Sequence, residues 1–277
     1  MSFPLLRPIL LADSITRVGG EAKGAVVVNA SHGGVYAAFC AARLAVAAAI
    51  FNDAGVGRGK AGISGLDYLE ALGVPAAAVS HQSARIGEGA DMMARGILSY
   101  RNELAGSLGC RAGMSCREAA EALRRAEEKG LEPPPEHEAQ FLILADPPAV
   151  WALDSASLVG PQHKGAILVT GSHGGLLGGK PETALKYDAL AALFNDAGIG
   201  IDEAGTRRIF ALDGRGIAAA TVAAESARIG ESRSTYEEGI LSRVNATAAS
   251  LGIEPGISAR DFVALIRQKS APKGDSR

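Results

Sequence analysis

The chain has 277 residues, of which 47% are hydrophobic and 21% are charged. This length corresponds to one large domain or two small ones, and the apolar fraction supports a buried core, so the composition predicts a soluble globular protein. The 28 basic and 30 acidic side chains give a formal net charge of −2 at pH 7. Such a chain has no overall field to attract nucleic acid or an anionic membrane surface, so any affinity for anions must be local.

Cysteine usage and apolar segments indicate the compartment. The chain has three cysteines: Cys40, Cys110 and Cys116. Their positions, without CxxC or Cys/His spacing, argue against a disulfide framework and a structural zinc site and favour the reducing cytoplasm. The apolar stretch 3–12 is broken by prolines and an arginine, so we expect no signal peptide. The longest apolar segment, 35–51, is shorter than the roughly 18 residues of a membrane span, so we expect no membrane contact.

Three blocks of sequence occur twice, in the same order. KGAVVVNASHGG at 23–34 returns as KGAILVTGSHGG at 164–175, FNDAG at 51–55 returns at 194–198, and SARIGE at 83–88 returns at 226–231. A repeat this long that occurs only twice is not a solenoid and indicates duplication of a whole α/β unit. Between the copies, the segment GLEPPPEHE cannot continue a helix or pair in a central strand. We therefore expect a first unit at 1–129, a linker at 130–140 and a second unit at 141–277.

Within each copy, short apolar runs without alternation are followed by Gly-rich turns and by helical patterns. The predicted strands are 25–30, 46–51 and 75–80 in the first copy and 166–170, 190–194 and 217–223 in the second. Such runs are typical of parallel strands covered on both faces, and right-handed crossovers bring their strand-to-helix loops to one edge. The sequence predicts an α/β fold of two Rossmann-like units with mainly parallel sheets, related by a pseudo-twofold axis.

Three helix starts are marked by a serine with an acidic residue three positions later. These pairs are Ser115 and Glu118, Ser234 and Glu237, and, more weakly, Ser258 and Asp261. In a capping box the serine hydroxyl and the acidic side chain each accept a hydrogen bond from a free backbone N–H of the first turn.

The SHGG blocks, at 31–34 and 172–175, follow the first predicted strand of each copy, at the sheet edge where ligands bind. Their glycines are Gly33, Gly34, Gly174 and Gly175. At a helix start, glycine N–H groups can approach an anionic or carbonyl oxygen, which the helix dipole also favours. A simple helix N-cap is the alternative interpretation.

The serines and histidines of these blocks are the candidate catalytic groups. Ser31 and Ser172 would donate a hydrogen bond to the ligand or act as nucleophiles, although neither block has the full G-x-S-x-G pattern. His32 and His173 would transfer protons, each serving the opposite copy if the copies face one another. The alternative is a histidine hydrogen-bonded to local backbone.

Asn52 and Asp53, and likewise Asn195 and Asp196, end the second strand of each copy. Here an aspartate could orient a histidine, act as a base or bind a hydroxyl. Together with the SHGG histidines, the aspartates form a possible divalent-metal set, but local HExxH-like spacing is missing, so we expect no cofactor and keep a metal as a secondary possibility. The alternative role is an Asx turn.

The SARIGE blocks supply Ser83 and Arg85 in one copy and Ser226 and Arg228 in the other. Arginine suits bidentate binding of a carboxylate or phosphate, so the pair predicts a ligand with two anionic or carbonyl groups across the pseudo-dyad. The alternative is an ion pair with the glutamate of the same block.

Some positions differ in charge between the copies. Arg58, Lys60, His81 and Gln82 in the first copy correspond in place to Asp202, Glu203, Ala224 and Glu225 in the second. The first copy has the more basic edge, so we expect the anionic group of a ligand to lie there.

The chain has no GxGxxG after its first strand and no Walker A motif, so the usual modes of dinucleotide and NTP binding are not expected. The leading hypothesis is a cytoplasmic enzyme that acts on a small, carboxylate-bearing metabolite between the repeats, most simply a hydrolase of an amide, lactam or ester. A lyase or isomerase with the same site, a non-catalytic protein that binds small anions, and an assembly protein are the alternatives. We also expect a homo-oligomer, because Ala-rich helices permit close packing.

Overall fold

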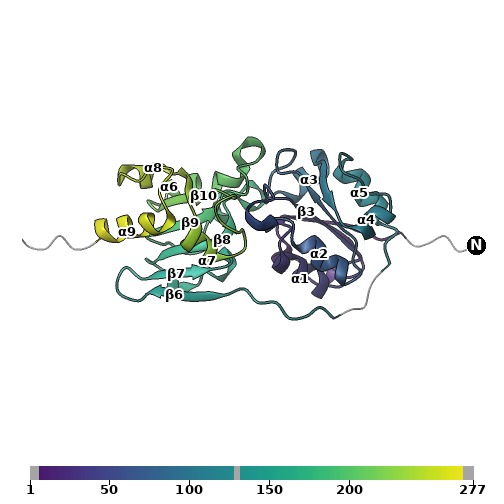
Figure 1. Ribbon diagram of the computed structural model, residues 1–277, viewed down its shortest axis with the longest axis horizontal. Coiled ribbons are helices and arrows are strands. Elements are labelled where there is room, and N and C mark those ends of the chain that lie inside the picture. Colours follow the sequence, from purple (N-terminus) through teal and green to yellow (C-terminus); the bar gives the residue numbers. More distant parts are fainter. Residues whose placement is uncertain (1–5, 128–131, 271–277) are drawn as a thin grey trace, which may run out of the picture.

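A computed structural model describes residues 6–127 and 132–270 of the chain. These residues form two α/β units that lie side by side along the long axis of the molecule (Figure 1). The predicted fold class is confirmed: each unit has one mainly parallel sheet with helices on both faces. Within the described segments, no helix has the length and apolar character needed to cross a membrane.

Unit one contains a five-stranded sheet in the order β1-β2-β3-β4-β5. Its strands are β1 (Ile9–Ala12), β2 (Val26–His32), β3 (Ala48–Asn52), β4 (Ala76–Val79) and β5 (Leu98–Arg101). Its helices are α1 (Val35–Arg43), α2 (Gly65–Ala71), α3 (Gly89–Arg95), α4 (Glu103–Ser107) and α5 (Cys116–Leu123), with short 3-10 turns η1 (Ile15–Arg17), η2 (Gly20–Ala22) and η3 (Arg58–Lys60). Strands β1 to β4 are parallel and β5 is antiparallel.

Unit two repeats this plan and adds a strand, in the order β11-β10-β9-β8-β7-β6. Its strands are β6 (Gln140–Leu144), β7 (Val150–Leu153), β8 (Ile167–His173), β9 (Ala191–Asn195), β10 (Ala218–Val222) and β11 (Leu241–Val244). Its helices are α6 (Arg207–Asp213), α7 (Ser232–Glu238), α8 (Ala246–Ser250) and α9 (Ala259–Ser270), with 3-10 turns η4 (Ala156–Leu158), η5 (Pro161–His163), η6 (Leu177–Gly179), η7 (Pro181–Thr183) and η8 (Ile201–Thr206).

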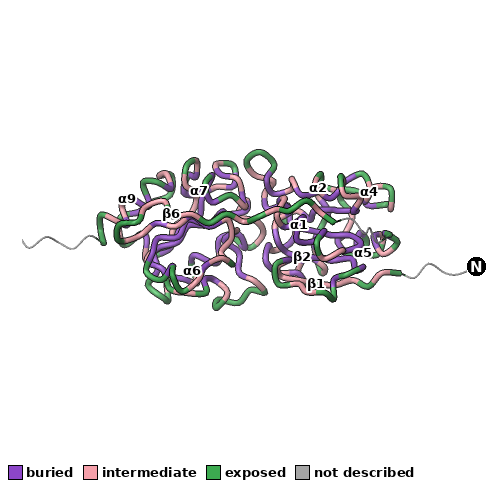
Figure 2. The backbone as a smooth tube through the Cα atoms, turned by 90° about the horizontal axis from the view of Figure 1, so that it is seen from below, coloured by how far each residue is buried: buried purple, intermediate pink, exposed green. Residues whose placement is uncertain are grey.

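The predicted strands correspond to β2, β3, β4, β8, β9 and β10, which are buried along nearly their whole length. Figure 2 shows this buried backbone at the centre of each unit and exposed backbone at its rim. Many central strand positions are alanines, such as 76–78 in β4, and their small side chains let the helices approach both faces of the sheet. The edge strands were not predicted because they are short and only partly buried.

The linker predicted at 130–140 is an extended segment from residue 132 to 139, and its last residue, Gln140, starts β6. Residues 130 and 131 lie outside the described residues. The segment runs along the surface towards β6 (Figure 2). It contacts unit one on the way, because the Tyr68 hydroxyl donates to the Pro134 carbonyl at 3.1 Å.

One predicted helix is missing from unit two. After Gly175, where unit one has α1, unit two has only the turns η6 and η7. The α1 sequence is rich in alanine, a strong helix former, whereas the second copy has Gly178 and Gly179 at positive φ and then Pro181. The expectation that both SHGG blocks open a helix is therefore wrong for the second copy.

The predicted helix starts have mixed outcomes. Ser115 and Glu118 form the expected capping box at α5, and the hydroxyl of Ser258 accepts from the Asp261 N–H at 3.0 Å. The start predicted at Ser234 is wrong, because α7 already begins at Ser232. The Ser234 hydroxyl instead accepts from the backbone N–H of Arg228 at 2.9 Å.

The two units meet around a local pseudo-twofold axis. Gly55 and Gly198, which are equivalent positions, lie against each other so closely that a methyl group on Gly55 would be 2.7 Å from the Cα of Gly198. Two equivalent backbone hydrogen bonds flank this contact, from residue 58 to residue 224 at 2.8 Å and from residue 201 to residue 81 at 2.9 Å. Equivalent loops therefore form both sides of the interface.

Candidate functional site

The two SHGG loops meet in a cleft between the units. The larger of two cavities there has a volume of about 560 Å³ and is lined mainly by unit two. The smaller has a volume of about 70 Å³ and is lined by both loops. The cavities adjoin, because they share five lining residues: Ser14, Thr16, Ser155, Ser172 and His173.

The larger cavity is called the cationic cavity here, after its four basic residues: Arg17, Lys180, Lys186 and Arg208. Glu182 is the one carboxylate among its lining residues, and hydroxyl groups supply most of the other polar atoms. Such a wall offers charge-assisted hydrogen bonds to an anion.

Arg208 is the buried member of this set, with 5% of its surface exposed. Its guanidinium donates to the carbonyls of Gly175, at 3.0 and 3.3 Å, and Ala184, at 3.0 Å, and it lies over the Phe194 ring. Burial, and then the charge of Arg17, lower the pKa of Arg208 to about 10, so it stays cationic at neutral pH. No carboxylate of the described segments pairs with it, and an uncompensated buried charge is costly.

The space around Arg208 exists only in unit two. The Arg208 N–H donates to the carbonyl of Gly174 at 2.7 Å, as the N–H of its counterpart Gly65 donates to Gly33 at 2.8 Å. A methyl group on Gly65 would lie 2.5 Å from the Gly34 carbonyl oxygen and 2.7 Å from the Cβ of Ala38 on α1. Helix α1 thus fills in unit one the region that the η6–η7 segment leaves open in unit two.

The smaller cavity is called the histidine cavity here, because His32 and His173 both line it. Each ring accepts a backbone hydrogen bond at Nδ1, from Gly34 or Gly175, at 3.1 Å. Burial lowers the pKa of His32 to about 4 and that of His173 well below its ordinary value. Both rings are therefore neutral with the proton on Nε2, which makes them hydrogen-bond donors to a ligand and not bases at neutral pH.

Each histidine ring contacts a loop of the opposite copy. The ring of His32 lies against Gly230 of unit two, and the ring of His173 lies against Gly87 of unit one. Both glycines belong to SARIGE blocks and have positive φ values, so a side chain there would be strained as well as crowded.

The hydroxyl groups of the two SHGG serines accept equivalent hydrogen bonds from the backbone. The Ser31 hydroxyl accepts from the Ile15 N–H at 3.1 Å, and the Ser172 hydroxyl accepts from the Ala156 N–H at 2.8 Å. Each keeps its O–H to donate into the cleft. Among the residues described, no base lies within hydrogen-bonding distance of either hydroxyl, so this geometry does not activate a nucleophile.

The N–H groups of the four SHGG glycines are not available to a ligand. Gly33 and Gly174 donate to the carbonyl oxygens that end β3 and β9, at 3.1 and 2.7 Å. Gly34 and Gly175 donate to the histidine rings. The predicted anion site on these N–H groups is therefore wrong, and the glycines serve close packing of the loops.

The NDAG residues hold the loops together outside the cavities. The buried amides of Asn52 and Asn195 each bridge their own turn to the SARIGE block of the same unit. Asp53 accepts from His81 Nδ1 at 2.7 Å and from the Ser99 hydroxyl at 2.7 Å, and Asp196 accepts from two backbone N–H groups at 2.9 Å.

The pKa values of the two aspartates are shifted in opposite directions. Burial raises the pKa of Asp53, but the hydrogen bonds from His81 and Ser99 outweigh burial and the net shift is downward. Burial raises the pKa of Asp196, whose unit has Ala224 in place of His81. Neither aspartate lines the cavities with the SHGG histidines, and the described part of the chain contains no group of three or more potential metal ligands.

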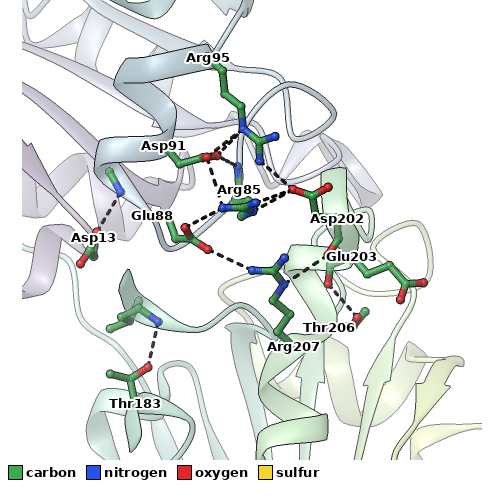
Figure 3. A network of polar contacts seen from close by, with 12 residues as sticks. Asp13, Arg85, Glu88, Asp91, Arg95, Thr183, Asp202, Glu203, Thr206 and Arg207 are labelled. Atoms are coloured by element: carbon green, nitrogen blue, oxygen red, sulfur yellow. Dashed lines mark hydrogen bonds and ion pairs between the residues drawn. The ribbon is translucent and has the colours of Figure 1, made fainter. Parts of the chain in front are cut away.

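The SARIGE side chains also lie outside the two cavities. Arg85 pairs with Asp202 at 2.8 Å and with Glu88 at 3.3 Å (Figure 3), and Arg228 has two carboxylates at 3.8 Å. The hydroxyls of Ser83 and Ser226 each bridge two backbone groups of their own unit. These contacts agree with the alternative interpretation of the arginines, in which each pairs with the glutamate of its own block. They do not support a role in anchoring a substrate.

The charge difference between the copies serves their contact. Asp202 of unit two forms ion pairs with Arg85 and Arg95 of unit one (Figure 3). Arg207 of unit two forms an ion pair with Glu88 of unit one. The basic edge of the first copy leads us to expect the anionic group of a ligand there, and this stays a prediction; the cationic cavity itself is lined mainly by unit two.

Sequence reasoning missed the residues that give the cleft its charge. Lys180 and Lys186 lie in the segment that does not match between the copies, and Arg208 replaces a glycine. In the histidine cavity it also missed Tyr36 and Glu138. A comparison of the two copies could have found these residues, because they lie at positions where the copies differ. An asymmetric site in a duplicated fold can be built only from such positions.

Comparison with known protein families, with curated proteins and with solved structures finds no match to this chain, so the functional inference rests on the cleft itself.

Proposed function

We propose that this protein binds a small, carboxylate- or phosphate-bearing metabolite in the cleft between its two units. The observation that carries the proposal is Arg208, a buried cation without a carboxylate partner among the described residues, in a cavity that three more cations line. A ligand anion would supply the missing charge. The cavity volume of about 560 Å³ lies in the range of small-molecule sites.

The donors in the cleft support this assignment. Three of the five N–H groups of Arg208 are bonded to carbonyl oxygens, which leaves two for a ligand. Ser172 and His173 line both cavities and offer an O–H and a neutral Nε2–H donor. The sequence also named these two residues, as nucleophile and base, and we assign them donor roles in this proposal.

Titration calorimetry with succinate and inorganic phosphate tests the proposal. We expect binding to the wild-type chain and a Kd about ten- to hundredfold higher for the double variant Lys180→Ala/Lys186→Ala, because hydrogen bonds to charged groups contribute about 1.5–3 kcal/mol. Both lysines are exposed, so the variant should fold normally. Lys269→Ala, which removes an exposed charge outside the cavity, is the matched control. Absence of binding, or equal Kd values in all three proteins, would contradict the proposal.

Turnover of the bound metabolite is a second candidate, and one observation favours it. Burial raises the pKa of Glu138, which lines the histidine cavity, to about 7, and a carboxyl with such a pKa suits proton transfer. Hydrolysis of an amide, lactam or ester stays the leading prediction, with lyase and isomerase chemistry as alternatives. In a screen of carboxylate-bearing amides, lactams and esters, Glu138→Gln should lower kcat about 10²- to 10⁴-fold; undiminished turnover would exclude this role.

We also propose a cytoplasmic location and a homo-oligomeric state for the protein. The three cysteine thiols are buried and unpaired, which supports the cytoplasmic location. A homo-oligomer stays a prediction, to be checked by sedimentation analysis.

A further inference from the structure

The histidine cavity has a chemical character opposite to that of the cationic cavity. Glu138 and Asp154 both line it, and neither lines the cationic cavity. Within the described ranges, no lysine or arginine forms an ion pair with either carboxyl. The four cations that line the larger cavity do not line the smaller one.

The two carboxyls lie on adjacent segments of the chain, and three hydrogen-bond donors hold Asp154 in place. Glu138 lies near the end of the extended segment that leads into β6, and Asp154 directly follows β7. Asp154 accepts hydrogen bonds from the N–H of Ala139 at 2.7 Å and from the N–H and hydroxyl of Ser232 at 2.9 and 2.7 Å. These three donors keep the Asp154 carboxyl fixed at the edge of the cavity.

The two histidines do not neutralise this acidic side, because their lowered pKa values leave both rings uncharged. His173 has 7% of its surface exposed and lines both cavities, and its Nε2 has no hydrogen-bond partner among the described residues. The cleft therefore has a cationic side, a neutral hydrogen-bonding middle and an acidic side. The volume of about 70 Å³ on the acidic side admits only a small head group, since one water occupies about 30 Å³.

We propose that the ligand is a zwitterion, an amine-bearing carboxylate or phosphate, whose ammonium group occupies the histidine cavity beside Glu138 and Asp154 and whose anionic group occupies the cationic cavity beside Arg208. This inference rests on the proposed function and adds the chemical class of the ligand. An ammonium group is small enough for the histidine cavity and donates charge-assisted hydrogen bonds to its two carboxyls, whereas an anionic head group would be repelled by them.

The titration of Glu138 supports this arrangement. Desolvation, and then the charge of Asp154, raise the pKa of Glu138 to about 7 against a hydrogen bond from Ser155 that lowers it. An ammonium group beside the carboxyl favours the ionised form. The titratable and charged groups on the elements around it are Tyr36, Cys40 and Arg43 of α1, His32, His173 and Asp154. Burial raises the pKa of Tyr36 to about 12 and raises that of Cys40, so both are neutral near pH 7. Zwitterion binding at pH 7 should therefore release up to about half a proton from Glu138.

Calorimetry with matched ligand pairs tests the inference. The pairs are 4-aminobutyrate with butyrate, and phosphoethanolamine with ethyl phosphate, which distinguish a carboxylate from a phosphate anion. For at least one pair we expect the amine-bearing member to bind about tenfold or more tighter, because it adds a charge-assisted interaction. Glu138→Gln should remove that preference. Glu132→Gln, an exposed change in the same extended segment, should retain the preference.

The outcomes separate the two proposals. Equal affinity for both members of each pair, or an amine preference that survives in Glu138→Gln and in Glu138→Gln/Asp154→Asn, would overturn the zwitterion inference while anion binding stands. No binding of any member would overturn both proposals. Titrations in two buffers of different ionisation enthalpy should show proton release with the amine-bearing ligand in the wild type and none in Glu138→Gln; equal release in the two proteins would count against the inference.

Discussion

Equivalent residues in the two units have acquired different roles. Asp53 and Asp196 occupy the same position in the repeat, and both carboxyls are buried. In unit one His81 pairs with the carboxylate, whereas in unit two Ala224 leaves only hydroxyl and backbone donors. The loss of the histidine partner, together with the nearby charge of Glu225, leaves the pKa of Asp196 raised where that of Asp53 is lowered.

This difference predicts opposite pH dependences of stability. A lowered pKa in the folded state means that Asp53 contributes stability above its ordinary pKa of 3.8, and that this contribution is lost as the pH falls below it. For Asp196 the raised pKa means that its contribution is present below 3.8 and is lost as the pH rises through the folded-state value. Asp53→Asn should lower the free energy of unfolding at pH 7 by about 1.5–3 kcal/mol.

Urea unfolding of the wild type, Asp53→Asn and Asp196→Asn between pH 3 and pH 7 measures this. The advantage of the wild type over Asp53→Asn should grow with pH, and its advantage over Asp196→Asn should shrink with pH. Parallel curves for the two variants would show that His81 does not control the carboxylate.

At the scale of elements, the main asymmetry is the exchange of α1 for the η6–η7 segment. In unit one, α1 packs on α2 through Gly65, and their contact leaves no space for a side chain. In unit two, the glycines and the proline after Gly175 prevent a helix, and the space that results accommodates Arg208. The presence of α1 closes this region in unit one, and the absence of an equivalent helix leaves it open in unit two.

Substitution of Gly65 tests how tightly α1 closes unit one. Gly65→Ala should destabilise the protein by about 1–3 kcal/mol, because the added methyl group would overlap the Gly34 carbonyl and Ala38. Gly214→Ala is the matched control, since a methyl group there meets no heavy atom within 4 Å and its φ of −63° suits alanine. Denaturant titration of both variants provides the comparison, and equal stability would show that α1 is loosely packed.

At the scale of the molecule, the cleft exists because two units associate through small residues and ion pairs. Gly55 and Gly198 allow the backbones to touch, and equivalent alanines and isoleucines form a small apolar cluster beside them. The ion pairs in Figure 3 are half-exposed, and such pairs contribute about 0–1 kcal/mol each. Close backbone packing, more than charge, should therefore hold the units together.

Two interface variants distinguish these contributions. Gly198→Ala places a methyl group against Gly55 and the His81 ring at a φ of +73°, so it should separate the thermal unfolding of the two units into two calorimetric transitions. Asp202→Asn should leave a single transition with a small decrease in Tm. Two transitions in Asp202→Asn and one in Gly198→Ala would reverse this assignment.

The amino-acid sequence by itself determined the duplication, the six central strands, the start of α5 and the turn residues of the three repeated blocks. These features are local: a continuous apolar run, a capping serine or a glycine at positive φ acts on its own neighbours and can be recognised in one segment. The repeat also predicted that equivalent loops would meet, because two copies of one unit can associate about a twofold axis.

The tertiary structure alone decided the charge and the hydrogen-bonding groups of the cleft. Arg17, Lys180, Lys186 and Arg208 come from separate segments, and only folding brings their charges around one cavity. Burial is likewise a property of the folded chain, and it makes the SHGG histidines neutral donors where their residue type predicted proton transfer. Charge and protonation depend on distance and solvent exclusion, which a linear sequence does not contain.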